Sequence, residues 1–125
     1  MVDNDQTLEI VLQLIYCSCY GLTQNDLMDL CNIKGTDQIE KDTNWSQIET
    51  QLKGYIILRR GLFHFTRDIV REVVQEKYFI DPDNEEAMRR KLVTHFEKLE
   101  PGERKDKELV HQSTWLSSRT SPDLL

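Results

Sequence analysis

The chain has 125 residues, which is enough for one domain, or for one small domain and the beginning of a second. Hydrophobic residues make up 38% of the sequence and charged residues 30%, a composition that is typical of a folded globular chain and excludes an intrinsically disordered one. The formal net charge of -6 makes the chain acidic, which disfavours nonspecific binding to nucleic acids or anionic membranes.

The acidic charge is concentrated in the first third of the chain. Residues 1–33 contain five carboxylates and no lysine or arginine, and the first basic residue is Lys34. The longest mainly apolar stretch, Ile10 to Leu22, is interrupted by polar residues and is too short to span a bilayer. No basic segment precedes it, so the sequence shows no secretory signal and we expect no membrane partner.

The chain has three cysteines, and an odd number without a secretory signal indicates free thiols in a reducing compartment. We therefore expect a cytoplasmic protein. Cys17 and Cys19 lie two residues apart on a predicted helix, so their side chains point about 200° apart and cannot hold a metal together. Cys19 falls on the apolar face of that helix, where a cysteine behaves as a small buried hydrophobic residue.

Apolar residues at three- and four-residue spacing predict the first helix, which is expected to end at Gly21. Its apolar face consists of Leu8, Val11, Leu12, Ile15 and Cys19. A second, short helix follows, because Thr23 and Asp26 have the spacing of a capping box and precede an apolar face.

Residues 32–42 have little periodicity and are predicted to form a loop. A third helix is then expected, with Asn44 as its N-cap and Gly54 at its end. Its expected core-facing residues are Trp45, Ile48, Leu52 and Tyr55.

The pattern changes after the third helix from helical to β-rich. Residues 55–58 and 62–65 are two short β-rich runs separated by Arg59, Arg60 and Gly61, which predicts a hairpin with Gly61 in the left-handed conformation. Three helices followed by a two-stranded hairpin is the order of elements in a winged helix. The inner face of the hairpin must pack on the helices, because an isolated hairpin is only marginally stable.

The helical period returns after the hairpin. Thr66 is expected to cap a fourth helix, whose apolar positions are Ile69, Val70, Val73, Val74 and Tyr78. Residues 80–84 interrupt the pattern, and a fifth helix is expected from Glu85 to Leu99, ahead of Pro101. Residues 103–116 have a weaker apolar pattern. The predicted fold class is thus mainly α, with a winged-helix domain at 1–80, C-terminal helices at 81–116 and a frayed tail at 117–125.

No motif for catalysis is present. The spacings of the nucleotide-binding glycine loops and of the serine and cysteine nucleophile motifs are missing. His64, His95 and His111 are far apart and belong to no metal-binding motif. We therefore expect that the chain is not an enzyme, and that it has no catalytic residue, no metal site and no cofactor of its own.

Nucleic-acid binding is the alternative function, because winged helices often place their third helix in the major groove and their wing against phosphates. The predicted third helix carries only Lys53 as a cation, which is little charge for approaching a polyanion. Arg59 and Arg60 in the hairpin loop would suit phosphate contact, and they would equally suit a solvated turn. We expect nucleic acid not to be the partner.

Residues 65–74, FTRDIVREVV, resemble the winged-helix region that follows the nucleotide-binding core in STAND-class signalling ATPases. These are the NACHT and AP-ATPase relatives, including nephrocystin-like, telomerase-associated and tetratricopeptide-repeat proteins. In the family, the second strand of the wing leads into a helix with a pattern close to F-x-H-x-x-[LIV]-R-E-A-V, followed later by a tyrosine. The residues here that fit this pattern are Phe65, Val70, Arg71, Glu72, Val73 and Tyr78.

Three other stretches are similar to the family in the same order along the chain. Residues 21–27 resemble the start of its second helix, residues 88–96 resemble a helix ending in an aromatic residue, and residues 105–112 resemble a segment that leads into helical repeats. The family often has a histidine two residues after the phenylalanine, and in some members it senses the nucleotide phosphate. Arg67 occupies that position, and an arginine suits a phosphate contact as well as it suits solvent.

The resemblance implies a non-catalytic regulatory and protein-interaction module of a larger intracellular ATPase. Such a module would pack against the nucleotide-binding core of its parent chain and couple that core to downstream repeats, so its partners would be proteins. Arg59, Arg60 and Arg67 are the residues expected to face a neighbouring domain, with Arg67 as the candidate for nucleotide sensing in the intact protein.

Overall fold

The computed structural model describes residues 4–120. Its elements are α1 (Asn4–Cys17), α2 (Gln24–Leu30), α3 (Gln38–Gln51), β1 (Ile56–Arg59), β2 (Leu62–Phe65), α4 (Asp68–Tyr78), α5 (Pro82–Glu97) and α6 (Glu103–Thr120). The fold is mainly α, and its order of three helices, an antiparallel hairpin and three further helices is that of a winged helix with C-terminal helices, as predicted.

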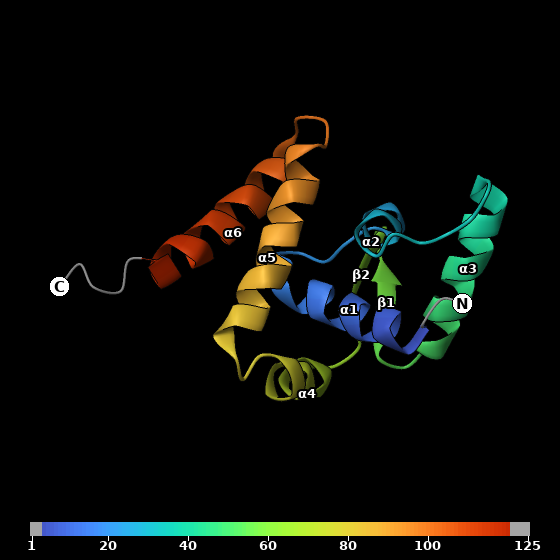
Figure 1. Ribbon diagram of the computed structural model, residues 1–125, viewed down its shortest axis with the longest axis horizontal. Coiled ribbons are helices and arrows are strands. Elements are labelled where there is room, and N and C mark those ends of the chain that lie inside the picture. The colour runs from blue at the N-terminus through green and yellow to red at the C-terminus, as the bar shows by residue number, and fades with distance from the viewer. Residues whose placement is uncertain (1–3, 121–125) are drawn as a thin grey trace.

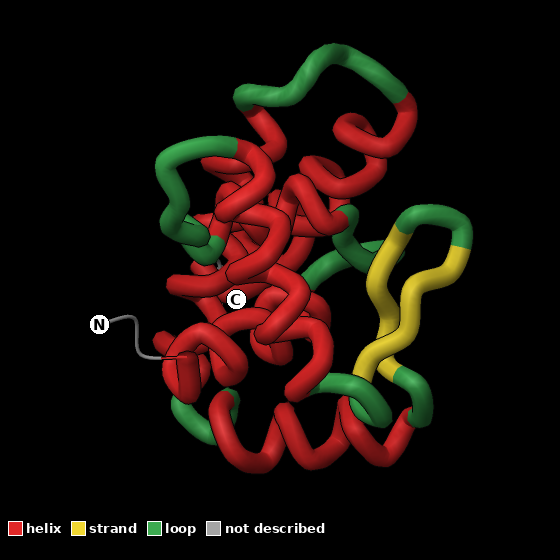
Figure 2. The backbone as a smooth tube through the Cα atoms, turned by 90° about the vertical axis from the view of Figure 1, so that its right-hand side faces the viewer, coloured by secondary structure: helices red, strands yellow, loops and turns green. Residues whose placement is uncertain are grey.

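Helix α1 lies across the middle of the molecule (Figure 1). Helix α3 lies at one end, and α5 and α6 lie side by side at the other, with α4 next to the winged helix on a third side. The hairpin runs along one edge of the helical body (Figure 2). Within the described part of the chain, no helix combines the length and the apolar character needed to cross a membrane.

The end of α1 differs from the prediction, because the helix stops at Cys17 and the chain then turns toward the hairpin. Cys17 is fully buried and Cys19 is only partly buried, so the expected burial of Cys19 was wrong. Gly21 has a φ of 96°, and a Cβ atom there would lie 2.5 Å from the carbonyl oxygen of Phe63. Only glycine therefore allows the chain to pass this close to β2.

The next residue, Leu22, makes an isolated β-bridge with Phe63 of β2. Its N–H donates to the Phe63 carbonyl at 3.4 Å, and its carbonyl accepts from the Phe63 N–H at 2.7 Å. Residues 24–30 then form α2, whose N-terminus has the predicted capping box between Thr23 and Asp26. The bridge and the cap together fix α2 against the wing.

Helix α3 begins at Gln38, seven residues earlier than expected, because its N-cap is Asp37 rather than Asn44. The side chain of Asp37 accepts the Glu40 N–H at 2.8 Å, while Asn44 donates to the Lys34 carbonyl. Residues 38–43 are all exposed, so they lack the apolar periodicity that would have marked them as helix. The predicted loop is correspondingly shorter.

The core lies between the three N-terminal helices, the inner face of the hairpin and α5. Trp45 and Phe63 make an edge-to-face contact at its centre, with ring centroids 5.6 Å apart. Leu92 and Phe96 of α5 are fully buried in the same apolar cluster as Leu14 of α1. The C-terminal helices thus share the core of the winged helix.

The hairpin has the predicted strands, with Ile56 paired to Phe65 and Arg59 paired to Leu62. Its loop has two residues rather than three, since Arg59 belongs to β1. Arg60 and Gly61 both have positive φ, at 53° and 81°, which is the combination that a type I′ turn requires. Gly61 therefore adopts the predicted left-handed conformation.

Helices α4 and α5 begin at other residues than expected. Arg67, not Thr66, occupies the N-cap position of α4, and the Thr66 hydroxyl donates instead to the Gly54 carbonyl at 2.8 Å. Helix α5 begins at Pro82 rather than at Glu85. Asp81 caps it, and proline is favourable at the first helical position because that residue needs no N–H donor.

Helix α6 continues to Thr120, so the prediction of a frayed tail was wrong for residues 117–120. Arg119 Nε lies 2.6 Å from Glu86 Oε1, and the same guanidinium pairs with Asp83. These contacts attach the last turn of α6 to α5. Residues 121–125 of the predicted tail lie outside the described residues.

Candidate functional site

The three arginines expected to face a partner lie at two ends of the wing. Arg59 and Arg60 are exposed at the hairpin turn, whereas Arg67 is exposed just before α4, beyond the opposite end of β2. The three residue steps of β2 alone separate these ends by about 10 Å. The structure therefore brings Arg59 and Arg60 together and keeps Arg67 apart from them.

A groove lies between α1 and α4, and we call it the α1–α4 groove. It has a volume of about 590 Å³. The side chains of Leu8 and Leu12 line it from α1, and those of Ile69 and Val73 line it from α4. Tyr55, which precedes β1, closes one end.

Three of the apolar side chains in this groove face solvent. The exposed fractions are 56% for Ile69, 52% for Val73 and 53% for Tyr55, so the expectation that Tyr55 faces the core was wrong. Helix α4 has apolar residues in two adjacent columns, of which only the column with Val74 enters the core. The other column forms an open apolar surface.

Charged side chains border this groove on both sides. Asp5 and Glu9 come from α1 and Lys77 comes from α4. Lys77 Nζ lies 3.9 Å from Glu9 Oε1, and both side chains are well exposed, so this ion pair holds the two helices together only weakly. The groove therefore has an apolar floor and a polar rim, as protein-binding surfaces have.

Arg71 of α4 stabilises the packing of α4 against α1. Its guanidinium lies 4.3 Å from the centroid of the Tyr16 ring on α1. Tyr16 also contacts Phe79, since the two ring centroids lie 4.9 Å apart. These stacked contacts fix α4 to α1.

A buried set of polar groups joins α1 to α5 and α6, and we call it the polar junction. It consists of the Cys17 carbonyl and the side chains of Glu85, Arg89, Glu108 and Gln112. Arg89 Nη1 donates to the Cys17 carbonyl at 3.1 Å, and Gln112 Nε2 donates to the same oxygen at 2.7 Å. The carbonyl at the end of α1, which has no partner within its own helix, is thus satisfied by two other helices.

The remaining contacts complete the polar junction. Glu85 Oε2 accepts from both Arg89 Nε, at 3.0 Å, and Arg89 Nη2, at 2.8 Å, so one carboxylate oxygen holds two nitrogens of the guanidinium. Glu108 accepts the Cys19 N–H at 3.1 Å and a Gln112 amide hydrogen bond at 2.7 Å. Arg89 is only 5% exposed, so its charge is compensated by these partners rather than by water.

A second buried cluster joins α2 to α5 and α6. His95 of α5 lies between two carboxylates of α2, with Nε2 2.7 Å from Asp26 Oδ1 and Nδ1 2.8 Å from Asp29 Oδ2. Arg104, at the start of α6, pairs with the other oxygen of Asp26. A neutral imidazole carries a single N–H, so both contacts are hydrogen bonds only when His95 is doubly protonated.

The environment of this cluster favours the charged forms. The hydrogen bond to Asp26 raises the pKa of His95 above its ordinary value, against the effect of burial, and Asp29 raises it further. Burial acts to raise the pKa of Asp26, but His95, the Thr23 N–H and Arg104 outweigh it and lower that pKa to about 2. The cluster therefore favours a protonated His95 paired with an ionised Asp26.

The cysteines show no sign of reactivity. Burial raises the pKa of the Cys17 and Cys31 thiols to about 12, which keeps both protonated at neutral pH. All three cysteines are free thiols. Among residues 4–120, no group of histidine, cysteine, aspartate and glutamate side chains is placed to hold a metal ion.

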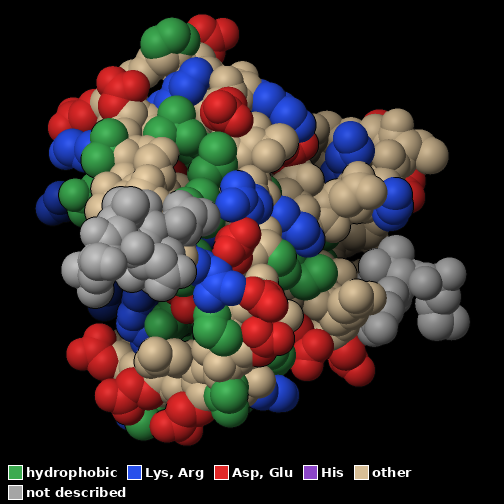
Figure 3. Space-filling view, turned by 60° about the vertical axis from the view of Figure 1, so that its left-hand side comes forward, with side chains coloured by type: hydrophobic (Ala, Val, Ile, Leu, Met, Phe, Trp, Pro, Cys, Tyr) green, Lys and Arg blue, Asp and Glu red, His purple; other side chains and the backbone are tan. Residues whose placement is uncertain are grey.

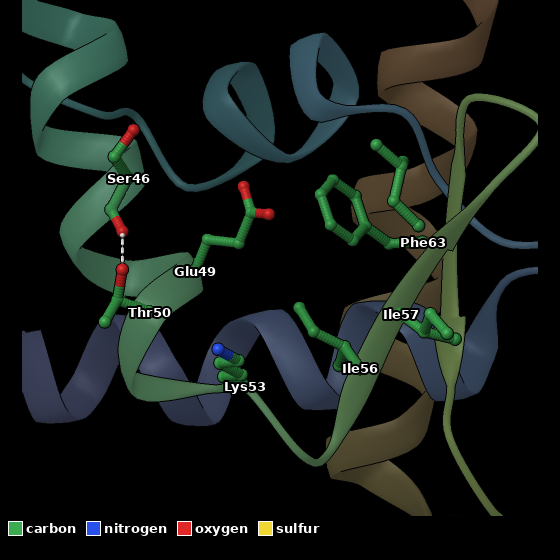
Figure 4. A pocket seen from close by; sticks show the side chains of 8 residues that line it. Ser46, Glu49, Thr50, Lys53, Ile56, Ile57 and Phe63 are labelled. Carbon is green, nitrogen blue, oxygen red and sulfur yellow. Dashed lines mark hydrogen bonds between the residues drawn. The ribbon is translucent and has the colours of Figure 1, made fainter.

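A third surface feature is a cleft between α3 and β1, which we call the wing cleft. It has a volume of about 450 Å³. Ile56 and Phe63 point into it from the hairpin, and Glu49 extends into it from α3 (Figure 4). Helix α3 has three carboxylates and one lysine, so the helix that a nucleic-acid reader would insert into the major groove is acidic.

Sequence reasoning identified the wing residues but missed both buried clusters. Arg89 and Glu108 lie in stretches that resemble the STAND family, yet their partners are far away along the chain, and no local spacing indicates them. Comparison with protein-family models, curated proteins and solved structures finds no match to this chain.

Proposed function

We propose that this chain is a non-catalytic regulatory and protein-interaction module of a larger intracellular STAND-type ATPase. The winged helix packs against the nucleotide-binding core of the parent chain and couples that core to the repeats that follow. The observation that carries the proposal is the α1–α4 groove, where Ile69, Val73 and Tyr55 are each more than half exposed. Contiguous exposed apolar side chains of this kind mark protein-binding surfaces.

The two buried clusters support the coupling part of the proposal. The polar junction attaches α5 and α6 to the end of α1, and His95 attaches α5 to α2. Separating a buried, hydrogen-bonded charge from its partners is costly, so α1 and the C-terminal helices move together. A displacement of α1 by a bound core would therefore be passed to α6 and to any repeat packed on it.

The exposed arginines provide the polar part of the interface in this proposal. The Arg67 side chain makes no capping hydrogen bond at the start of α4, so it is available to a nucleotide phosphate or a carboxylate of the core. Arg59 and Arg60 contact a second part of the partner from the wing tip. The proposal assigns no reaction, cofactor or metal to the chain and places it in the cytoplasm.

Nucleic-acid binding is the second candidate, favoured by the two adjacent exposed arginines at the wing tip. The acidic α3 opposes it, and acidic and basic side chains are interspersed over the face seen in Figure 3. A nucleic-acid reader would bind duplex DNA or RNA with an affinity that falls steeply with salt, and the double variant Arg59→Glu, Arg60→Glu would abolish that binding. The protein-interaction proposal expects neither effect.

The direct test uses the parent chain. The proposal predicts a Walker A loop before this segment and helical repeats after it. The nucleotide-binding core, expressed separately, should bind the 125-residue chain with different affinities in ADP and ATP. Ile69→Glu with Val73→Glu should weaken that binding about tenfold or more. Ile39→Glu is the matched control, because Ile39 is 78% exposed on α3, away from the groove.

A parent chain without a nucleotide-binding core would contradict the ATPase part of the proposal. Equal binding by the groove variant and the wild type, with the fold intact by circular dichroism, would contradict the role of the α1–α4 groove. Neither of these results depends on whether the chain binds nucleic acid in the salt titration.

A further inference from the structure

The outer edge of β1 is open. Among the described residues the strand pairs with β2 and makes one isolated bridge, between its first residue Ile56 and Lys53, so its outer edge is open at Leu58. By contrast, β2 is covered on both sides because Leu22 pairs with Phe63. Backbone groups on an open edge can accept a further strand.

The pairing pattern identifies the groups that face outward. Phe63 uses its N–H and carbonyl for Leu22, so the Leu58–Phe63 pair of the hairpin exchanges no hydrogen bonds. The N–H and carbonyl of Leu58 therefore point away from β2. Within residues 4–120 they have no hydrogen-bond partner.

The wing cleft lies directly beside this edge, and Leu58 is one of its lining residues. Leu58 is on the same face of β1 as the buried Ile56, yet it is 52% exposed, because it overhangs the cleft rather than the core. The edge thus offers two unpaired backbone groups next to an exposed apolar side chain.

The charges around the edge define what fits there. Arg59 and Arg60 are exposed at one end of β1 and Lys53 at the other, so the two ends of the edge are basic. Glu49 faces the cleft from α3, where it accepts the hydrogen bond of the Trp45 indole at 3.0 Å. A bound strand would therefore have an apolar centre and acidic ends.

We infer that the edge of β1 receives an extended segment of another protein as an added strand. The segment pairs its backbone with Leu58, places an apolar side chain against Leu58 and Ile56, and directs acidic residues toward Arg60 and Lys53. Strand addition of this kind takes its affinity from main-chain hydrogen bonds and its specificity from alternate side chains. The site is separate from the α1–α4 groove, so either proposal can fail without the other.

The test titrates the ¹⁵N-labelled 125-residue chain with a synthetic eight-residue peptide of four alternating valines and threonines between pairs of glutamates. Chemical shifts at Leu58 and its neighbours should change, and exchange of the Leu58 amide proton should slow. A peptide with a central proline should do neither, because it lacks a donor.

Two variants at Leu58 separate the backbone from the side chain. Leu58→Pro removes the outward N–H, which no bond inside the hairpin uses, and should weaken peptide binding about tenfold or more. Leu58→Ala keeps the N–H and should weaken it by a smaller factor. Lys53→Glu with Arg60→Glu should weaken binding most at low salt. Each variant is first checked for the wild-type spectrum outside the hairpin.

Three results would overturn the inference. The first is no shift at Leu58 up to about 1 mM peptide, a concentration at which even a weak strand addition is visible. The second is equal binding by Leu58→Pro and the wild type. The third is protection of the Leu58 amide that rises with protein concentration without peptide, because the edge would then pair with a second copy of this chain.

Discussion

At the residue scale, the strongest consequence of the structure concerns His95. Its raised pKa means that the contacts with Asp26 and Asp29 stabilise the fold fully at pH values below the ordinary histidine pKa. That contribution is lost as the pH rises through the raised pKa of the folded state, because the second ring proton leaves and one hydrogen bond goes with it. The fold is therefore expected to weaken as the pH rises past the ordinary histidine pKa and through the raised one.

The variant His95→Gln tests this expectation. In urea unfolding it should be about 2 kcal/mol less stable than the wild type at pH 6, because a buried charged hydrogen bond is removed. The difference should shrink toward pH 9. The control is His64→Gln. The imidazole of His64 lies in the wing and has no carboxylate partner in the described structure. A difference that stays constant with pH would show that His95 does not act through its charge.

Arg89 gives a second prediction at this scale. Arg89→Met leaves Glu85 without its donor and removes one of the two side-chain donors to the Cys17 carbonyl, and should lower the free energy of unfolding by about 3 kcal/mol. Arg90→Met is the matched control on the next residue of the same helix. Arg90 pairs with Glu86 in solvent, so its replacement should change the stability by less than about 1 kcal/mol. Equal effects of the two changes in a urea titration would contradict the importance of the polar junction.

At the scale of elements, the wing turn carries strain that can be relieved. Arg60 has a φ of 53°, which costs a residue with a side chain about 1 kcal/mol, and asparagine tolerates that conformation better. Arg60→Asn should therefore raise the free energy of unfolding by about 0.5 kcal/mol, and Gly61→Ala, at a φ of 81°, should lower it by about 1 kcal/mol. Thermal unfolding of both variants measures the difference, and a stabilising Gly61→Ala would contradict the turn geometry.

The elements also show what sequence can and cannot predict. The winged-helix order was predictable because the hairpin has its own local signals, two β-rich runs and a glycine. The start of α3 was not, since Ile39 is 78% exposed and its neighbours are polar, so its first turns carry no periodic pattern. Such turns are helical because Asp37 caps them and because the later turns pack, not because of their own apolar residues.

The candidate sites were predictable only in part, because only some of their residues carry a local sequence signal. Exposed arginines at a turn can be located from sequence, but apolar spacing in α4 does not distinguish the buried Val74 from the exposed Val73. The contact between Gln112 and the Cys17 carbonyl joins residues 95 positions apart, and no local pattern specifies it. Long-range polar contacts of this kind depend on how whole helices cross.

At the scale of the whole molecule, the shared core and the polar junction make the winged helix and the C-terminal helices one cooperative unit. The two tryptophans report on its two parts, since Trp45 lies in the core of the winged helix and Trp115 lies on α6 under Arg89. With both labelled as 5-fluorotryptophan, their ¹⁹F signals should disappear over the same range of urea concentration. Transitions at different concentrations would show that the two parts unfold separately.

The two ¹⁹F tryptophan signals also test how one residue, Arg89, affects the unfolding of the whole molecule. In Arg89→Met the Trp115 signal should be lost at lower urea than the Trp45 signal, because α6 loses its attachment to α1 while the contact of Trp45 with Phe63 is unchanged. Simultaneous loss of both signals in this variant would mean that the apolar contacts of Leu92 and Phe96, together with the His95 cluster, couple the two parts without Arg89.

The convergence of Arg89 and Gln112 on a single carbonyl also determines how the molecule responds to mechanical load. Tension applied to α6 reaches the carbonyl end of α1 through Gln112, and also through α5 and Arg89. The wing lies outside this route, since among the described residues the hairpin supplies none of the hydrogen bonds of the polar junction. A pull from the C-terminal side would therefore shift the helical body while the hairpin keeps its shape.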